Sequence, residues 1–289
     1  MFKMGLISWM AFLMCCFGCQ SKNETVAKND ETRMSVNINV NGNHISDRFL
    51  PPNGYTLMNH TSGFSQFLSN IELMPDGNKV LLYDGSLKRN QHAHAAILNI
   101  PVGNKDLQQC ADAIMRLRAE YLYQKEAYNP LKFNFTNGFT CDYMHWKDGY
   151  RVQINGNHCS WQKTAEPSTS RESFEKYLEL VFSYAGTLSL EKELLPTTIK
   201  DIQPGDVFIH GGSPGHAVIV VQVAQDSITH EKIFMLAQSY MPAQQIHILK
   251  NPNNTDVSPW YQMPKGDILE TPEWTFEITE LKKFADLDR

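Results

Sequence analysis

Basic charge, long apolar runs and cysteine are all scarce in this 289-residue chain. Its 26 lysines and arginines are outnumbered by 31 aspartates and glutamates, which gives a formal net charge of -5. The nearest thing to a basic stretch, Lys88 and Arg89, is an isolated pair expected in a solvated turn. Because no basic stretch is long enough to follow a phosphate backbone, nucleic acid is not an expected partner. Beyond the first nineteen residues no apolar run has the length of a membrane-spanning helix, and internal repeats are absent.

The N-terminal segment MFKMGLISWMAFLMCCFGC, residues 1–19, has the pattern of an export signal. It resembles a bacterial lipoprotein signal in which Cys19 becomes the lipidated first residue, although Cys16 stands where such signals usually carry leucine. Ordinary secretion is the alternative. The polar stretch 20–35 is expected to be a flexible tether, and 36–289 a single domain. We therefore expect a protein of the bacterial cell envelope, lipid-anchored to a membrane outside the cytoplasm.

Three cysteines follow that segment: Cys110, Cys141 and Cys159. An odd number in an exported chain leaves at least one thiol without an intramolecular partner. The sequence between Cys141 and Cys159 predicts a hairpin that turns at Asp148-Gly149, and a disulfide between the two cysteines then needs a bulge or a flared end. That disulfide stays open as an alternative, and Cys110 is unpaired either way.

Cys110 lies in the clearest predicted helix, KDLQQCADAIMRLRAEYLYQKEAY. Asp106 is expected to cap this helix, with Gln109 three residues later completing a capping box. A cysteine in the first turn meets unpaired N–H groups and the positive end of the helix dipole, which both favour the nucleophilic thiolate. Cys110 also falls on the apolar stripe, so a packing role remains the alternative.

A second helix is predicted at 173–188, and strands follow at 206–210, 216–223, 233–240 and 246–249. His216 opens the second of these strands after the turn sequence GGSPG, at the rim of the sheet. From that position an imidazole reaches a cleft.

A helix that carries cysteine, followed by an antiparallel sheet whose strand opens with histidine, resembles the papain-like cysteine hydrolases. In particular, QPGDVFIHGGSPGHAVIVVQVA resembles the CHAP and NlpC-type cell-wall amidases and peptidases, which share a Gly-Asp before one strand and a Gly-His at the next. The resemblance implies an α+β papain-like domain in which Cys110 is the nucleophile and His216 the base. The 106 positions between them exceed the usual spacing, so the hairpin and second helix would be an insertion.

The third catalytic residue departs from the CHAP pattern, which has Glu or Asn on the next strand. Here FMLAQSY offers Gln238 and Ser239. Because successive side chains alternate across a strand, only one of the two can contact His216, and the choice stays open.

Over nearly the whole chain after the tether, the sequence resembles an uncharacterised family of bacterial lipoproteins, a domain of unknown function. The resemblance implies no established activity. It rests on the stretches DLQQCADAIMRLRAEYL, SYAGTLSL, PGDVFIHGGSPGHAVIVV, LAQSYMPAQQIHIL, SPWY and TPEW.

Four residues are candidates for substrate binding. Gln108 precedes the thiol and is a candidate oxyanion donor, as a glutamine upstream of the papain nucleophile is. Arg116 suits a substrate carboxylate, although an ion pair with Asp112 explains it equally well. Trp260 and Tyr261 are candidates for stacking on sugar rings, with core packing as the alternative.

Other possible sites are weaker. Ser213 formally fits a G-x-S-x-G elbow, but a strand rather than a helix follows it. His92 and His94 would need a further ligand to hold zinc, so no metal or other cofactor is expected. His247 either packs in the sheet or joins the cleft.

The sequence thus predicts an envelope lipoprotein that acts as a cysteine-dependent amidase or peptidase on cell-wall peptide amide bonds. The alternative is a non-catalytic lipoprotein whose degenerate papain-like cleft binds glycan or peptide. Peptidoglycan is the expected partner in both cases.

Overall fold

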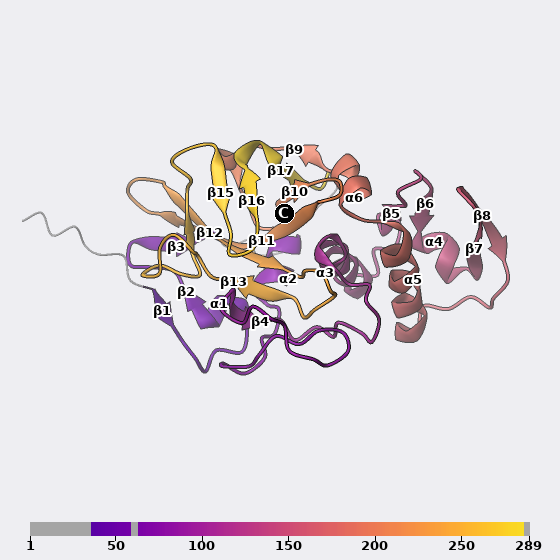
Figure 1. Cartoon of the computed structure of the whole chain (residues 1–289), viewed down its shortest axis with the longest axis horizontal. Coiled ribbons are helices and arrows are strands. Elements are labelled where there is room, and N and C mark those ends of the chain that lie inside the picture. The colour runs from indigo at the N-terminus through magenta and orange to yellow at the C-terminus, as the bar shows by residue number, and fades with distance from the viewer. Residues whose placement is uncertain (1–35, 59–62, 286–289) are drawn as a thin grey trace, which may run out of the picture. The chain divides into compact units, whose positions relative to one another are not determined.

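An antiparallel sheet organises this computed structural model, which describes residues 36–58 and 63–285 (Figure 1). Its strands, in spatial order, are β4 (His94–Ile97), β13 (His247–Leu249), β12 (Lys232–Gln238), β11 (His216–Asp226), β10 (Val207–His210), β17 (Leu281–Lys283) and β9 (Leu195–Pro196). Two short strands pair beside this path, β14 (Tyr261–Gln262) with β12 and β3 (Tyr55–Leu57) with β11. The four predicted strands are confirmed as β10 to β13, with small shifts of their ends.

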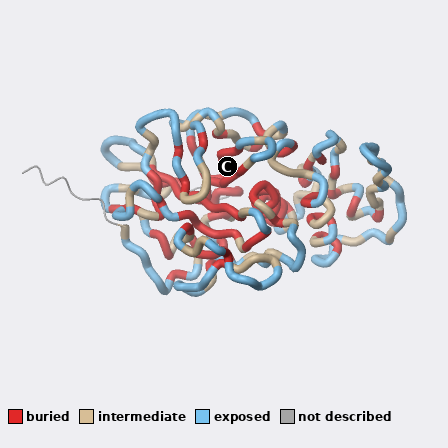
Figure 2. Tube along the Cα trace, viewed as in Figure 1, coloured by how far each residue is buried: buried red, intermediate tan, exposed pale blue. Residues whose placement is uncertain are grey.

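Alternation along β11 builds a core on each face of the sheet. Ala217, Ile219 and Val221 join the cluster on one face, and Val218 and Val220 join the cluster on the other. The register with β12 shifts between positions 220 and 222, which lets apolar residues fill both faces on either side of the shift. Figure 2 shows these central strands as the most continuously buried part of the fold.

Helices pack on one face of the sheet, and a β-hairpin packs on the other. The helix α3 (Cys110–Gln124) packs against β11 and β12, and the helices α2 (Gly63–Ser69) and α6 (Thr187–Glu193) contact it. On the opposite face, the hairpin of β15 (Ile268–Glu270) and β16 (Thr275–Glu277) contributes Leu269 and Phe276 to the second core. The predicted α+β class is confirmed in this form, with six α-helices and several antiparallel sheets among the described residues.

The predicted start of α3 was three residues early. The helix begins at Cys110, and the backbone N–H of its N-cap, Gln109, donates to Asp112 Oδ2 at 3.0 Å. Asp106 does not cap it, because its carboxylate accepts instead from the backbone N–H of Ala243 at 2.7 Å. A contact with a distant loop therefore replaces the local cap. Cys110 still occupies the first turn, now as its first residue.

The predicted hairpin turn at Asp148-Gly149 was also wrong. A short helix, α4 (Tyr143–Lys147), fills that segment because the Asp142 side chain accepts the backbone N–H of His145 and starts it. The hairpin follows as β7 (Tyr150–Asn155) and β8 (His158–Lys163), with its turn at Gly156.

No disulfide forms between Cys141 and Cys159, since all three described cysteines are free thiols. Cys141 lies opposite Phe133 in the hairpin of β5 (Lys132–Asn134) and β6 (Thr140–Asp142), whereas Cys159 lies opposite Ile154 in the next hairpin. The two cysteines thus belong to separate two-stranded sheets.

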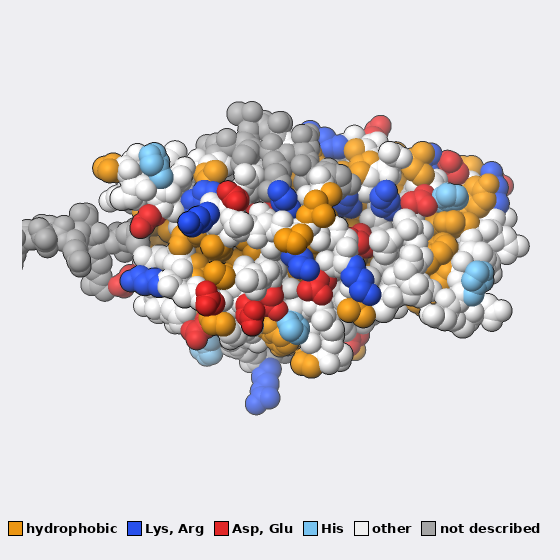
Figure 3. Space-filling view, turned by 90° about the horizontal axis from the view of Figure 1, so that it is seen from above, with side chains coloured by type: hydrophobic (Ala, Val, Ile, Leu, Met, Phe, Trp, Pro, Cys, Tyr) orange, Lys and Arg blue, Asp and Glu red, His pale blue; other side chains and the backbone are white. Residues whose placement is uncertain are grey.

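The second predicted helix is confirmed as α5 (Arg171–Tyr184), capped by Ser170. It lies with α4 and the β5–β6 and β7–β8 hairpins at the side of α3 away from the large sheet (Figure 1). The remaining elements are β1 (Asn37–Ile38), α1 (Ile45–Arg48), β2 (Phe49–Leu50), and the 3-10 turns η1 (Ile199–Asp201) and η2 (Ile278–Glu280). On the face shown in Figure 3, acidic and basic side chains lie among one another, so neither sign of charge dominates the described residues there.

Candidate active site

Cys110 and His216 stand at the first residues of two elements that pack together, α3 and β11. The backbone N–H of Ala217, the residue after His216, is close enough to the Cys110 sulfur to lower the pKa of the thiol. The fold therefore brings the two predicted residues into one neighbourhood. No hydrogen bond joins the sulfur to the imidazole itself among the described residues.

The glycine before His216 is required by close packing. A Cβ at Gly215 would lie 2.5 Å from the carbonyl oxygen of Gly212 and 2.6 Å from Thr187 Oγ1. Backbone atoms cannot give way by that much, so any larger residue displaces the loop. The Gly-His pair in the sequence thus reflects the tight turn that delivers His216 to the start of β11.

Gln238, rather than Ser239, contacts the histidine. The Gln238 amide oxygen lies 2.8 Å from His216 Nε2 across the β11–β12 pair. The Ser239 hydroxyl points to the other side and lies 2.8 Å from the carbonyl oxygens of both Gln108 and Gln244. Ser239 therefore ties the segment before Cys110 to the end of the strand that carries Gln238.

The neighbours of Gln238 determine which ring nitrogen of His216 carries the proton. Gln238 Nε2 donates to Glu273 Oε2 at 2.7 Å, and a carboxylate only accepts. The amide oxygen must then face His216, which makes Nε2 of the neutral ring the protonated nitrogen. The lone pair resides on Nδ1, which has no hydrogen-bond partner among the described residues. The neutral imidazole is thus set up to accept a proton at Nδ1.

A buried ion pair holds Glu273 in place. Lys88 Nζ pairs with Glu273 Oε2, and only 5% of the Lys88 side chain is exposed. Burial lowers the pKa of Lys88, and Glu273 opposes that shift. His247 completes the cluster: its Nδ1 donates to the Gln245 carbonyl at 2.9 Å, and its Nε2 lies 3.4 Å from Lys88 Nζ. The expectation that Lys88 lies in a solvated turn was wrong, because the Glu273 carboxylate draws it into the fold.

Three aromatic rings enclose the imidazole. The ring centroids of Tyr240, Trp274 and Phe276 lie 4.8, 5.4 and 5.9 Å from that of His216. Trp274 and Phe276 come from the β15–β16 hairpin, whose turn also carries Glu273. As a result, His216 is 2% exposed, and the neighbouring Cys110 is 6% exposed.

Enclosure sets the resting charge of both groups. Burial raises the pKa of the Cys110 thiol to about 11, assisted by Asp112 and opposed by nearby backbone N–H groups. Burial also lowers the pKa of His216 to about 4. At neutral pH the resting site therefore holds a neutral thiol and a neutral imidazole. The expected thiolate is not present at rest, because the loss of solvent outweighs the helix N-terminus.

Two predicted substrate-binding residues pair with the protein itself. The Arg116 guanidinium donates to Glu120 at 2.6 Å and to Glu175 at 3.0 Å, rather than to Asp112. Arg116 also lies 3.3 Å from the side-chain oxygen of Gln108, which is 1% exposed. Gln108 therefore faces the α3–α5 side of the helix through its side chain.

The two aromatic candidates are core residues. Trp260 is fully buried, and Tyr261 is buried with its hydroxyl donating to the Lys250 carbonyl at 2.6 Å. Neither ring presents a face for stacking on a sugar. Of the remaining histidines, His94 Nε2 lies 3.1 Å from the Asn78 carbonyl oxygen. Across residues 36–58 and 63–285 no group of three potential metal ligands gathers.

The sequence reasoning missed Glu273 as part of this site. Glu273 falls in TPEW, one of the stretches that carried the family resemblance, and this was the available signal. The signal did not indicate that the glutamate reaches the histidine through Gln238.

Comparison with protein families identifies the family of this chain. A family model described as domain of unknown function 4846 covers residues 45–283, so the chain belongs to that family. No curated protein and no solved structure matches the chain. In the described part of the chain, none of the helices has both the length and the apolar character needed to cross a membrane.

Proposed function

We propose that this family member is a cysteine-dependent amidase or peptidase acting on cell-wall peptide amide bonds, with Cys110 as nucleophile and His216 as general base. The observation that carries the proposal is the chain of hydrogen bonds from Glu273 through Gln238 to His216 Nε2. It leaves Nδ1 as the basic nitrogen beside the backbone that contacts the Cys110 sulfur. The order of cysteine on a helix, histidine on a strand and amide on the next strand supports a papain-like fold of the CHAP or NlpC type.

The reaction proceeds through a thioester. The Cys110 S–H proton passes to His216 Nδ1 as the sulfur forms a bond with the substrate carbonyl carbon. The carbon–nitrogen bond then breaks, and the imidazolium returns the proton to the leaving amine. Water, deprotonated by His216, attacks the thioester and releases the acid and the restored thiol. Because both groups rest in their neutral forms, proton transfer accompanies attack instead of preceding it.

The start of α3 supplies the stabilisation for the negative oxygen of the tetrahedral intermediate. The first N–H groups of a helix have no intrahelical partner, and they include those of Cys110 and Ala111. Such donors, aimed at the site where charge develops, account for a factor of about 100–1,000 in rate per donor in related chemistry. We assign the oxyanion role to this backbone and not to Gln108, whose side-chain oxygen contacts Arg116.

The cell-wall substrate follows from the proposed location. Cys19, the signal at 1–19 and the tether at 20–35 lie outside the described residues, and we propose that lipid on Cys19 anchors the chain at the envelope. Peptidoglycan stem peptides are the amides available there. The proposed chemistry requires no cofactor, since the protein residues supply the nucleophile, the base and the oxyanion donors.

The test uses purified full-length chain and peptidoglycan fragments that carry stem peptides, with products identified by mass spectrometry. We expect cleavage of one amide bond by the wild type and its loss in Cys110→Ala. Cys159→Ala is the matched control, because it removes another free thiol far along the chain from the site and should cleave normally. Equal cleavage by Cys110→Ala, or none by the folded wild type, would refute the proposal.

The second candidate function is a non-catalytic lipoprotein that binds glycan or peptide. The burial of both Cys110 and His216 favours it, since a packed thiol needs no access to substrate. Native-state labelling with iodoacetamide separates the two functions. Reaction of Cys110 in the folded chain supports catalysis, whereas reaction after denaturation alone supports the binding protein.

A further inference from the structure

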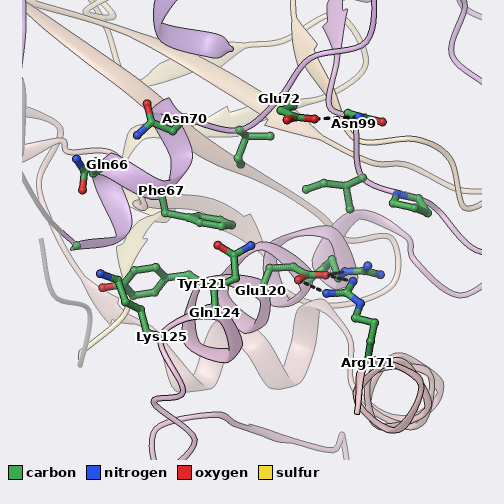
Figure 4. Close-up of a pocket in the computed structure, with 15 residues that line it drawn as sticks. Gln66, Phe67, Asn70, Glu72, Asn99, Glu120, Tyr121, Gln124, Lys125 and Arg171 are labelled. Atoms are coloured by element: carbon green, nitrogen blue, oxygen red, sulfur yellow. Dashed lines mark hydrogen bonds and ion pairs between the residues drawn. The ribbon is translucent and has the colours of Figure 1, made fainter. Parts of the chain in front are cut away.

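A cavity of about 620 Å³ lies between α2, residues 99–101 and the second half of α3 (Figure 4). Its α3 residues run from Arg116 to Gln124, and neither Cys110 nor His216 lines it. The volume is within the range of small-molecule sites in proteins. This cavity, which we name the amide groove, is therefore separate from the proposed active site.

Amide side chains from three segments line the amide groove. Gln66 comes from α2 and Asn70 directly follows it, while Asn99 comes from the connecting loop and Gln124 from the end of α3 (Figure 4). Asn99 donates to Glu72 at 3.2 Å, while the side chains of the other three have no hydrogen-bond partner among the described residues. Each amide both donates and accepts, as a sugar hydroxyl does. Three solvent-exposed amide side chains with no protein partner in the described part of the chain thus line one cavity.

Two aromatic rings supply the apolar part of the lining. The rings of Phe67 on α2 and Tyr121 on α3 have centroids 5.8 Å apart and planes tilted by 54°. Tyr121 is buried and Phe67 is half-buried, so both are held by the core. Flat apolar surface beside polar hydrogen-bonding groups matches a pyranose ring, which carries C–H faces and a hydroxyl rim.

The charges of the groove are largely compensated. Glu120 accepts from Arg116 at 2.6 Å and from Arg171 at 2.5 and 2.6 Å, and both arginines also contact Glu175. The other two charged residues of the lining, Glu72 and Lys125, have opposite signs. A neutral ligand therefore gains more from this surface than an ion of either sign.

We propose that the amide groove binds a neutral saccharide. A peptide is disfavoured, because extended peptides are commonly held by the free edge of a strand and the walls here are helices and a loop. This site goes beyond the proposed hydrolase activity and does not depend on Cys110. In an envelope protein, it would hold a glycan while other residues act on a peptide.

The test measures binding by titration calorimetry to full-length chain carrying Cys110→Ala, so that no turnover intervenes. The probes are chitotetraose of N-acetylglucosamine, cellotetraose and an unmodified stem tetrapeptide. We expect at least one saccharide to bind and Asn70→Ala/Gln124→Ala to weaken it by about tenfold or more, as two lost hydrogen bonds imply. Both residues are exposed, so the fold should tolerate the change.

The matched control is Asn157→Ala/Gln162→Ala, which removes the same two side-chain types from exposed positions outside the groove. It should bind as the parent does. The proposal is overturned if neither saccharide binds at millimolar concentration, if both double variants bind equally, or if the peptide alone binds and responds to the groove variant. Loss of hydrolysis in Cys110→Ala is measured separately, so the two proposals fail independently.

Discussion

Glu273→Gln should destabilise the fold mainly through Lys88. The substitution keeps the shape of the side chain but removes the charge that compensates an ammonium group only 5% exposed. Leaving that charge buried and unpaired costs about 3–5 kcal/mol. The alternative is to deprotonate Lys88, and from the ordinary lysine pKa of 10.5 to pH 7 this costs at most about 4.8 kcal/mol, at about 1.36 per pH unit. Both routes give a loss of roughly 4 kcal/mol at pH 7.

The pH dependence identifies Lys88 as the source of this loss. By the deprotonation route, the folded variant keeps Lys88 neutral at pH 7, whereas the unfolded chain protonates it below pH 10.5. The unfolded state then binds more protons, so the stability of the variant rises with pH. Raising the pH from 7 to 9 should narrow the gap between wild type and variant by about 2.7 kcal/mol.

Chemical unfolding of wild type and variant at pH 7 and pH 9 measures the loss of stability at pH 7 and the narrowing of that loss at pH 9. A loss of about 4 kcal/mol corresponds to a fall in melting temperature of roughly 8–16 °C for a domain of this size. The double variant Lys88→Met/Glu273→Gln is the control, because removing both charges should restore most of the stability. A gap below about 1 kcal/mol at pH 7 would show that the ion pair does not support the site. A large gap that does not narrow by pH 9 would refute the deprotonation of Lys88 in the folded variant.

Three further predictions concern the site. Wild-type stability should fall by about 3 kcal/mol as the pH drops from 6.5 to about 4, because His216 gains a proton in the unfolded chain that burial denies the folded imidazole. Unfolding titrations of His216→Asn should lack this pH dependence, and an equal dependence would contradict the assignment to His216. Gly215→Ala should lower the free energy of unfolding in urea by about 1–3 kcal/mol, while Gly266→Ala, where a Cβ meets open space, should lower it little. Equal losses would show that a Cβ at Gly215 meets no close contact. Trp274→Ala should accelerate iodoacetamide labelling of Cys110 in the folded chain by about tenfold or more, because the labelling rate depends on how accessible the thiol is. An unchanged rate would mean that the Trp274 ring does not cover the site.

Local patterns predicted the elements well where local forces decide them. The strands from β10 to β13 follow from apolar runs between turn residues, and α3 follows from helical spacing. The start of α3 was misplaced because Asp106 accepts from Ala243, 137 positions away. No pattern within a window of residues contains such a contact.

The same limit applies to the site. Alternation showed that Gln238 and Ser239 point to opposite faces, but only the fold reveals which face His216 occupies. The pairing of Lys88 with Glu273 spans 185 positions and left no local signal. The helical pattern correctly placed Cys110 in the first turn of α3, but the predicted thiolate does not follow from that position, because the burial that raises the pKa of the thiol is a property of the whole fold.

The turn between β15 and β16 places Glu273 and Trp274 next to each other, closed by the Thr271 N–H donating to the Trp274 carbonyl at 2.8 Å. Glu273 holds the Gln238 amide that contacts His216, and Trp274 packs against the imidazole ring itself. An outward swing of the whole turn would therefore release the amide together with the ring. Under the proposed hydrolysis, a substrate would have to enter by rotation of the Trp274 side chain alone, or from the Tyr240 side, with the turn left in position.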